Sequence, residues 1–312
     1  MKLALCCGIN DYPGTYNDLY GCVDDAKNWS NILYENFGFD RTDLLLNEQA
    51  TRGNIKAKFL SMLSGAKSGD ILVFTYSGHG TNVPDTLDPD EADGYDEALY
   101  TYDGVLLDDE LRDMIKRLPN DVQLIFISDS CFSGTITRGD LTTKRMNRSR
   151  SRKQVTKYMP HQHEGFARRV HKLKRRKRFL IEEDMEEIVL TGCSDQEYGY
   201  DAYIDGKWGG AFSHFAVKTL KDEYTYNEWY AEIRKYLPSD NYPQTRQLEG
   251  SSANKELCVF AEIEPESSGS SVSSASSESS GSSESSESSA SPEPPQISFW
   301  QWFINWISSW FK

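Results

Sequence analysis

The chain has 312 residues, a formal net charge of −14 at neutral pH, and 38% hydrophobic residues. This length and hydrophobic content suffice for one large domain or two modest ones with a buried core, which excludes a wholly disordered chain. The six cysteines include no Cys-x-x-Cys pair, so neither a disulfide framework nor a zinc site is expected. The apolar run at residues 3–9 lacks a small-residue cleavage site, and we interpret it as the first strand of a cytoplasmic protein.

Strand-like apolar runs alternate with amphipathic segments in the first part of the chain. Strands are predicted at residues 2–9, 43–46, 70–76 and 122–129. Helices are predicted at residues 19–37, before Gly38, at 51–64, with Thr51 as the cap, and at 108–118, before Pro119. This alternation indicates a largely parallel α/β sheet.

The folded unit is predicted to span residues 1–263. Its later elements are a strand at residues 186–195, helices at 209–221 and 225–237, and a last strand at 255–263. Between the two halves lies a basic insert, residues 144–178, with fifteen Lys and Arg residues against one Glu, whereas the rest of the chain is strongly acidic.

Two segments of different composition follow the folded unit. Residues 264–296 are mainly Ser, Glu and Pro, which cannot bury enough apolar surface to fold, so a disordered linker is predicted. Residues 297–312 place polar residues on one helical face, opposite Trp, Phe and Ile. At about 1.5 Å per residue, that helix spans roughly 24 Å, short of a hydrocarbon core of about 30 Å. It is expected to bind a membrane surface or a groove in a partner protein; packing back onto the domain is the alternative.

Two chemically useful side chains follow buried strands of the same kind. His79 comes soon after the predicted strand at residues 70–76, and Cys131 soon after the strand at 122–129. Since ligands bind at the carboxyl ends of strands in an open α/β sheet, neighbouring parallel strands would present both side chains at one edge. A nearby histidine favours the thiolate, which is the attacking form of a cysteine. The sequence therefore predicts a Cys131/His79 dyad.

The alternative is that Cys131 is a small buried hydrophobe at the end of a strand. The remaining histidines lie in the basic insert or inside a predicted helix: His161, His163, His171 and His214. Gly80 beside His79 lets the backbone approach a ligand closely. A backbone N–H there, together with that of Cys131, could bind the oxyanion of a tetrahedral intermediate.

These residues carry a family resemblance. The motifs YSGHG at residues 76–80 and DSCFSG at 129–134 resemble those of caspase-type cysteine peptidases of family C14, and GINDY followed by LYGCVDDA resembles metacaspases in particular. DGYDEALY, DDEL and TGCSD follow in the expected order, so the resemblance covers about residues 2–262. It implies a caspase-like fold, with a largely parallel six-stranded sheet flanked by helices, and peptide hydrolysis by Cys131 and His79.

The resemblance also implies an oxyanion hole formed by Gly80 and the Cys131 amide. It places the S1 pocket at four residues: Cys22, Asp25, Ser77 and Asp129. Two carboxylates in such a pocket offer charge-assisted hydrogen bonds to Arg or Lys and repel Asp. Protein or peptide substrates with Arg or Lys before the scissile bond are therefore expected.

The basic insert falls where caspase relatives carry the linker between their large and small subunits. Because it is rich in Arg and Lys, one hypothesis is self-cleavage there. Binding of nucleic acid or anionic lipid, or a solvated loop without a ligand, are the alternatives, and nucleic acid is not the expected partner.

Calcium is the one cofactor for which the sequence gives an indication. The acidic stretch from Asp85 to Glu97 departs from the EF-hand pattern, but in calcium-dependent metacaspases several aspartates bind the ion. The residues in or near the matching motifs are Asp93, Asp96, Asp108 and Asp109. Arg138 stands about where a further Asp ligand is expected, which departs from the family pattern. Calcium is therefore a candidate activator, and the chemistry itself requires no cofactor.

Two other functions compete with the peptidase hypothesis. The chain could be a silent caspase-like scaffold, which the intact His79 and Cys131 argue against, or a membrane-active protein acting through its Trp-rich segment. If the peptidase hypothesis holds, the enzyme is expected in the cytoplasm, with membrane association through residues 297–312.

Overall fold

The computed structural model describes residues 1–262 except residues 15, 85–94, 132–153, 161–184 and 195–196. The predicted linker at 264–296 and helix at 297–312 lie outside the described residues. A central sheet has the strand order β12-β9-β7-β3-β1-β2. Its strands are β1 (Lys2–Gly8), β2 (Arg41–Leu46), β3 (Ile71–Ser77), β7 (Gln123–Asp129), β9 (Glu187–Thr191) and β12 (Gln247–Glu249). All neighbours pair in parallel except β12, which is antiparallel to β9, so the predicted largely parallel six-stranded sheet is confirmed.

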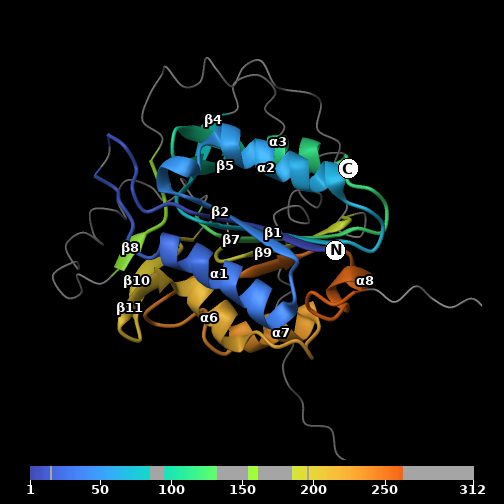
Figure 1. Ribbon diagram of the computed structural model, residues 1–312. Coiled ribbons are helices and arrows are strands. Elements are labelled where there is room, and N and C mark those ends of the chain that lie inside the picture. The colour runs from blue at the N-terminus through green and yellow to red at the C-terminus, as the bar shows by residue number, and fades with distance from the viewer. Residues whose placement is uncertain (15, 85–94, 132–153, 161–184, 195–196, 263–312) are drawn as a thin grey trace, which may run out of the picture.

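Helices cover both faces of this sheet, as predicted (Figure 1). One face carries α2 (Arg52–Gly65) and α3 (Asp108–Ile115); the other carries α1 (Cys22–Phe37), α6 (Ala211–Thr219) and α7 (Tyr226–Arg234). Side chains alternate between faces along a strand. Leu5 and Cys7 of β1 therefore pack in the core beside α2, and Ala4 and Cys6 in the core beside α1.

Two small antiparallel sheets accompany the main sheet, and they contribute residues to the candidate active site described below. One contains β4 (Gly80–Pro84), β5 (Tyr95–Thr101) and β6 (Gly104–Leu107). The other contains β8 (Gln154–Thr156), β10 (Tyr200–Ile204) and β11 (Lys207–Gly210). Strand β8 belongs to the basic insert, where no strand is predicted, because three residues are too few to show a period. A short 3-10 helix, η1 (Asn47–Gln49), lies between β2 and α2.

The strand predicted at residues 255–263 is wrong. That region starts with the end of α8 (Ser252–Lys255) and continues without a strand, while β12 supplies the sixth strand of the sheet. Val259 and Phe260 are buried for another reason: the ring of Phe260 packs edge-on against Phe37 and Phe39, with centroids 5.1 and 5.8 Å away. An apolar run can thus reflect packing against helices rather than pairing in a sheet.

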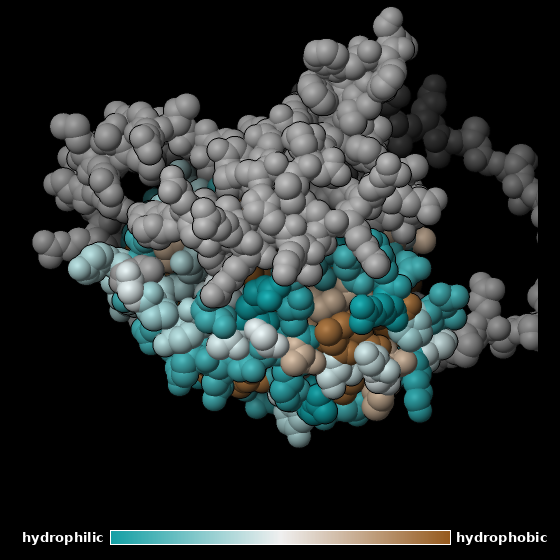
Figure 2. Space-filling view, turned by 90° about the horizontal axis from the view of Figure 1, so that it is seen from above, coloured by the Kyte–Doolittle hydropathy of each residue, from teal (hydrophilic) through white to brown (hydrophobic). Residues whose placement is uncertain are grey.

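The described surface is mainly hydrophilic on the side of α2 and α3, with a small group of hydrophobic atoms (Figure 2). The exposed large apolar side chains are mostly tyrosines, which keep a polar group in water. Among the residues that the structure describes, no helix combines the length and hydropathy needed to cross a bilayer.

Truncating Phe260 tests its role as an anchor of the core. Phe260→Ala is expected to lower the free energy of unfolding by about 3 to 5 kcal/mol, because it removes a ring that is 1% exposed and leaves a cavity. Urea unfolding measures the loss. Tyr34→Ala, at a side chain that is 60% exposed, is the control and is expected to change stability by less than about 0.5 kcal/mol. Equal losses in both variants would contradict this role.

Candidate active site

The loops after β3 and β7 bring His79 and Cys131 to one edge of the sheet. Ser77 and Asp129 are paired neighbours in the parallel ladder, so each of the two candidate residues lies two positions beyond this pair. A side chain at Gly80 would place its Cβ only 2.3 Å from the carbonyl oxygen of Cys131. The close contact between the loops therefore depends on glycine at position 80.

The ring of His79 is buried and held in one orientation. Its Nε2 atom is hydrogen-bonded to the backbone oxygen of Asn17. Since a carbonyl only accepts, the proton sits on Nε2, and Nδ1, which lies on the side of the Lys157 backbone, can act as the base. Burial lowers the pKa of His79 to about 4, although the bond to Asn17 acts in the opposite direction. The imidazole is therefore neutral at pH 7.

Two backbone amides converge on one carbonyl oxygen, that of Lys157. The N–H of Gly80 donates to it over 2.9 Å and the N–H of Cys131 over 3.3 Å. These are the two amides expected to bind an oxyanion, and paired donors of this kind stabilise the charge that develops on a carbonyl under attack. The thiol of Cys131 is buried, and its Sγ donates to the backbone oxygen of Glu197 over 2.7 Å.

The residues expected to form the S1 pocket surround the side chain of Lys157. Its Nζ lies 3.2 Å from Asp129, 3.5 Å from Asp25 and 2.8 Å from the hydroxyl of Ser77. The thiol of Cys22 lies in the same electrostatic cluster. The side chain of Lys157 is fully buried in this pocket.

The surrounding elements hold the two carboxylates in place. Asp129 accepts a hydrogen bond from the N–H of Ser213 in the first turn of α6, where the helix favours negative charge. Asp25 accepts from Ser77 over 2.7 Å and from the N–H of Gly210 over 2.8 Å.

Charge is distributed unequally in this cluster. Burial would lower the pKa of Lys157, but Asp129, Cys22 and Asp25 raise it well above its usual value, so the side chain is an ammonium. Burial and the neighbouring Asp129 raise the pKa of Asp25 to about 7, against the opposing effect of Lys157. The pocket therefore stabilises one positive side chain. A further negative side chain in it would be repelled by the carboxylates of Asp129 and Asp25.

Sequence reasoning missed three residues of this pocket. Lys157 is one of fifteen basic residues in its segment, and no local pattern distinguishes it. At Gly210 a Cβ would lie 2.0 Å from Asp129 and 2.3 Å from Nζ of Lys157, so only glycine leaves room for the cation. Asp201 accepts from the N–H groups of Tyr20 and Gly21, and thereby ties β10 to the start of α1. The glycine pair at residues 209–210 lies within the helix predicted at 209–221, whereas the observed helix α6 begins only after it, at Ala211.

The chain around Lys157 crosses the site as an extended peptide. Before Lys157, β8 pairs antiparallel with β10, with Thr156 opposite Tyr200. After it, the N–H of Met159 donates to the oxygen of Gly80 over 2.9 Å. Pairing on both sides of one residue is the way an extended peptide adds to sheet edges in recognition sites.

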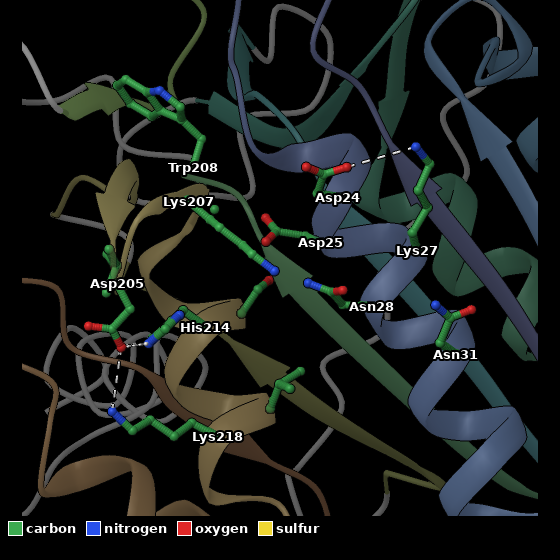
Figure 3. Close-up of a pocket in the computed structure, with 14 residues that line it drawn as sticks. Asp24, Asp25, Lys27, Asn28, Asn31, Asp205, Lys207, Trp208, His214 and Lys218 are labelled. Atoms are coloured by element: carbon green, nitrogen blue, oxygen red, sulfur yellow. Dashed lines mark ion pairs between the residues drawn. The ribbon is translucent and has the colours of Figure 1, made fainter.

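A separate cavity of about 880 Å³ lies next to this pocket, between α1, α6 and the β10–β11 hairpin. Asp25 lines it, and the side chains of Lys207 and Asn28 point into it (Figure 3). Its lining is mixed in charge: Lys27 lies 3.8 Å from Asp24, Lys218 lies 3.8 Å from Asp205, and Nε2 of His214 lies 3.4 Å from the same Asp205 carboxylate. The cavity therefore does not share the acidic character of the S1 pocket.

Three of the four predicted calcium ligands lie among the described residues. Asp93 lies outside the described residues, and Asp96 is buried in β5. Asp108 and Asp109 begin α3 and lie 3.0 and 3.8 Å from Arg112. Within the described part of the chain, no three His, Cys, Asp or Glu side chains are grouped to hold a metal, so no step of the chemistry is assigned to calcium.

Comparisons with known proteins agree on one family. A family model described as the metacaspase, peptidase C14 domain matches residues 2–140. Metacaspase-1 of Meyerozyma guilliermondii is 30% identical over 287 residues, which cover 80% of this chain and 69% of the relative. Metacaspase-7 of Arabidopsis thaliana is 37% identical over 161 residues, 47% of this chain and 40% of the relative. A crystal structure of a Geobacter sulfurreducens protein matches 84% of this chain and 99% of its own, with 25% identity and a TM-score of 0.66.

The buried imidazole predicts how stability depends on pH. An unfolded chain takes up a proton on His79 near its ordinary pKa, and the folded chain only near pH 4. The contribution of His79 is therefore complete above about pH 6.5 and is lost as the pH falls from about 6.5 to 4. Urea unfolding between pH 7 and 4 is expected to show a steeper loss for the wild type than for His79→Gln. Parallel curves would contradict a buried neutral imidazole.

Proposed function

The chain belongs to the metacaspase family of cysteine peptidases and has a caspase-like fold, and we propose that it is an endopeptidase that cleaves after Lys or Arg. One observation carries this proposal. The side chain of Lys157 fills the acidic pocket while its own carbonyl oxygen accepts hydrogen bonds from Gly80 and Cys131. A residue in this position is held as the residue before a scissile bond would be.

The proposed specificity follows from the charges in the pocket. Two carboxylates and a hydroxyl can bind an ammonium by charge-assisted hydrogen bonds, and a guanidinium offers more donors in a planar fork. An Asp side chain would bring a further negative charge into a buried site that already has Asp25 and Asp129. The negative charge of the pocket therefore favours binding of an Arg or Lys side chain and disfavours binding of an Asp side chain.

The proposed chemistry uses groups already in place. The thiol proton of Cys131 passes to Nδ1 of His79, and the thiolate attacks the carbonyl carbon. The amides of Gly80 and Cys131 hold the oxyanion, and the proton on His79 passes to the leaving amine as the peptide bond breaks. Water then hydrolyses the thioester with His79 as the base. The Sγ of Cys131 must first leave its hydrogen bond with Glu197.

Self-processing is proposed at the bond between Lys157 and Tyr158. This bond lies in the basic insert, and the extended backbone of residues 154–159 crosses the site in a single chain. Most other basic residues of the insert lie outside the described residues, so binding of nucleic acid or lipid there stays an alternative. Calcium activation and attachment through residues 297–312 to a membrane or a protein partner stay proposals from the sequence.

Self-processing has a specific expected product. N-terminal sequencing of fragments from the wild-type chain is expected to find a new terminus at Tyr158, because Lys157 is the residue in the pocket. Lys157→Arg is expected to keep this cleavage, whereas Lys157→Gln and Cys131→Ala abolish it. Lys153→Gln, which removes a charge from the same insert, is the matched control and should leave the fragment in place. A Tyr158 terminus from the Cys131→Ala chain would show that another protease makes it.

Peptide hydrolysis tests the pocket directly. Fluorogenic peptides ending in Arg or Lys are expected to be cleaved, and the matched Asp peptide is not. Asp25→Asn is expected to lower kcat/KM for the Lys peptide by about 10²-fold or more, because a buried cation loses a charged partner. The same assay with calcium or a chelator measures the ion requirement. Cleavage of the Asp peptide at a similar rate would contradict the proposed specificity.

Substitution of Gly210 tests whether the pocket needs the space beside this residue to bind a cation. Gly210→Ala is expected to abolish hydrolysis of Lys and Arg peptides, because the added methyl group occupies the place of the cation. Gly53→Ala in α2 is the matched control: its Cβ would meet no atom within 4 Å, so activity should stay at the wild-type level. Circular dichroism of both variants separates loss of activity from loss of fold. A folded Gly210→Ala variant with normal kcat/KM would contradict this account of the pocket.

A further inference from the structure

We propose that the site also selects the residue that follows the scissile bond, that it prefers tyrosine there, and that Asn82 recognises the tyrosine hydroxyl. This inference rests on the proposed function and extends it to the primed side. It assigns a specificity-determining role to a side chain of β4 that the motifs of the sequence do not single out.

The first observation is the position of Tyr158. It directly follows Lys157, and a parallel bridge pairs it with Gly80, the residue whose N–H donates to the Lys157 oxygen. If Lys157 is in the place of the residue before the scissile bond, Tyr158 is in the place of the residue after it. The side chain of Tyr158 therefore indicates what this subsite accepts.

The second observation is a set of polar and aromatic contacts to that side chain. The hydroxyl of Tyr158 donates to Oδ1 of Asn82 over 3.0 Å. Its ring lies 6.3 Å from that of Tyr198 and packs against a buried cluster that contains Cys131 and Cys193. The subsite thus has apolar walls beside the reacting cysteine and one polar group at its far end.

Asn82 is well placed to discriminate. It is 6% exposed, so its oxygen has little access to water when the subsite is filled. Phe in place of Tyr would fill the same ring space but would leave this buried acceptor without the hydroxyl donor. A site built around a hydroxyl rejects the analogue that lacks it, because its own polar group then loses a partner.

The residue after Tyr158, Met159, is also held by the site, and it contacts the residue that orients His79. Met159 is 3% exposed, its oxygen accepts from the hydroxyl of Thr81, and its Sδ lies 3.3 Å from Nδ2 of Asn17. The backbone oxygen of Asn17 is the group that orients His79. A medium-sized apolar residue at this second position therefore packs against the residue that orients the base. The substrate class is Lys or Arg, then Tyr, then an apolar residue such as Met.

A set of quenched peptides tests the subsite. They share one sequence and differ only after the Lys: Lys-Tyr-Met, Lys-Phe-Met and Lys-Ala-Met. With the full-length wild-type chain, kcat/KM for the Tyr peptide is expected to exceed that for the Phe peptide by about 3- to 10-fold, as expected for one net hydrogen bond. The Ala peptide, which loses the ring contacts too, is expected to be slower than both.

Asn82 variants assign the preference to one side chain. In Asn82→Ala the ratio of the Tyr to the Phe peptide is expected to fall to about one, and Asn82→Ser provides a second variant in case the first does not fold. Asn28→Ala, in the neighbouring cavity, is the matched control and should keep the wild-type ratio. Equal kcat/KM for Tyr and Phe in the wild type would overturn the subsite and leave Lys and Arg specificity intact. No hydrolysis of any Lys or Arg peptide would overturn the proposed function and the subsite with it.

Discussion

The site is organised around one buried cation between two buried carboxylates. Isolated buried charges are costly, so Asp25 and Asp129 need the surrounding donors: Ser77, the N–H of Gly210 and the N–H of Ser213 at the start of α6. With Lys157 absent, the two carboxylates would face each other without a counter-ion. The fold therefore contains a pocket whose most stable state has a positive side chain inside it, and the proposed specificity for Lys or Arg rests on the same electrostatics that hold the pocket together.

Glycine at two positions lets the backbone itself take part in the site. The Gly80 amide can reach the Lys157 oxygen because nothing separates its Cα from the backbone of Cys131. The Gly210 amide can reach Asp25 because the space beside it is left to the Lys157 side chain. A methyl group at position 80 would collide with the backbone of Cys131, and one at position 210 would collide with Asp129 and the ammonium of Lys157. The geometry of the site is set as much by the absence of these side chains as by the groups that are present.

Much of this arrangement could be predicted from the sequence. The runs before His79 and Cys131 read as buried strands, and parallel pairing of β3 with β7 then brings the two residues to one edge. The acidic pocket followed from the resemblance to the family rather than from any local pattern, because Asp25 and Asp129 are far apart in the chain. Lys157 could not be predicted, since one of fifteen Lys and Arg residues in the insert carries no sign of its own burial. The strand expected at 255–263 failed because burial of Phe260 by helices looks the same as burial in a sheet.

Each of the two proposed reacting side chains is held by a backbone carbonyl. His79 donates to Asn17 through Nε2, which leaves Nδ1 as the base, and Cys131 donates to Glu197. The carbonyl of Lys157, which is the proposed scissile carbonyl, lies between β8 on one side and the pairing with Gly80 on the other. In the proposed chemistry the Cys131 side chain must rotate away from Glu197 to bring Sγ toward the carbonyl carbon. A residue after the scissile bond that packs beside Cys131, as Tyr158 does, therefore bears directly on that movement.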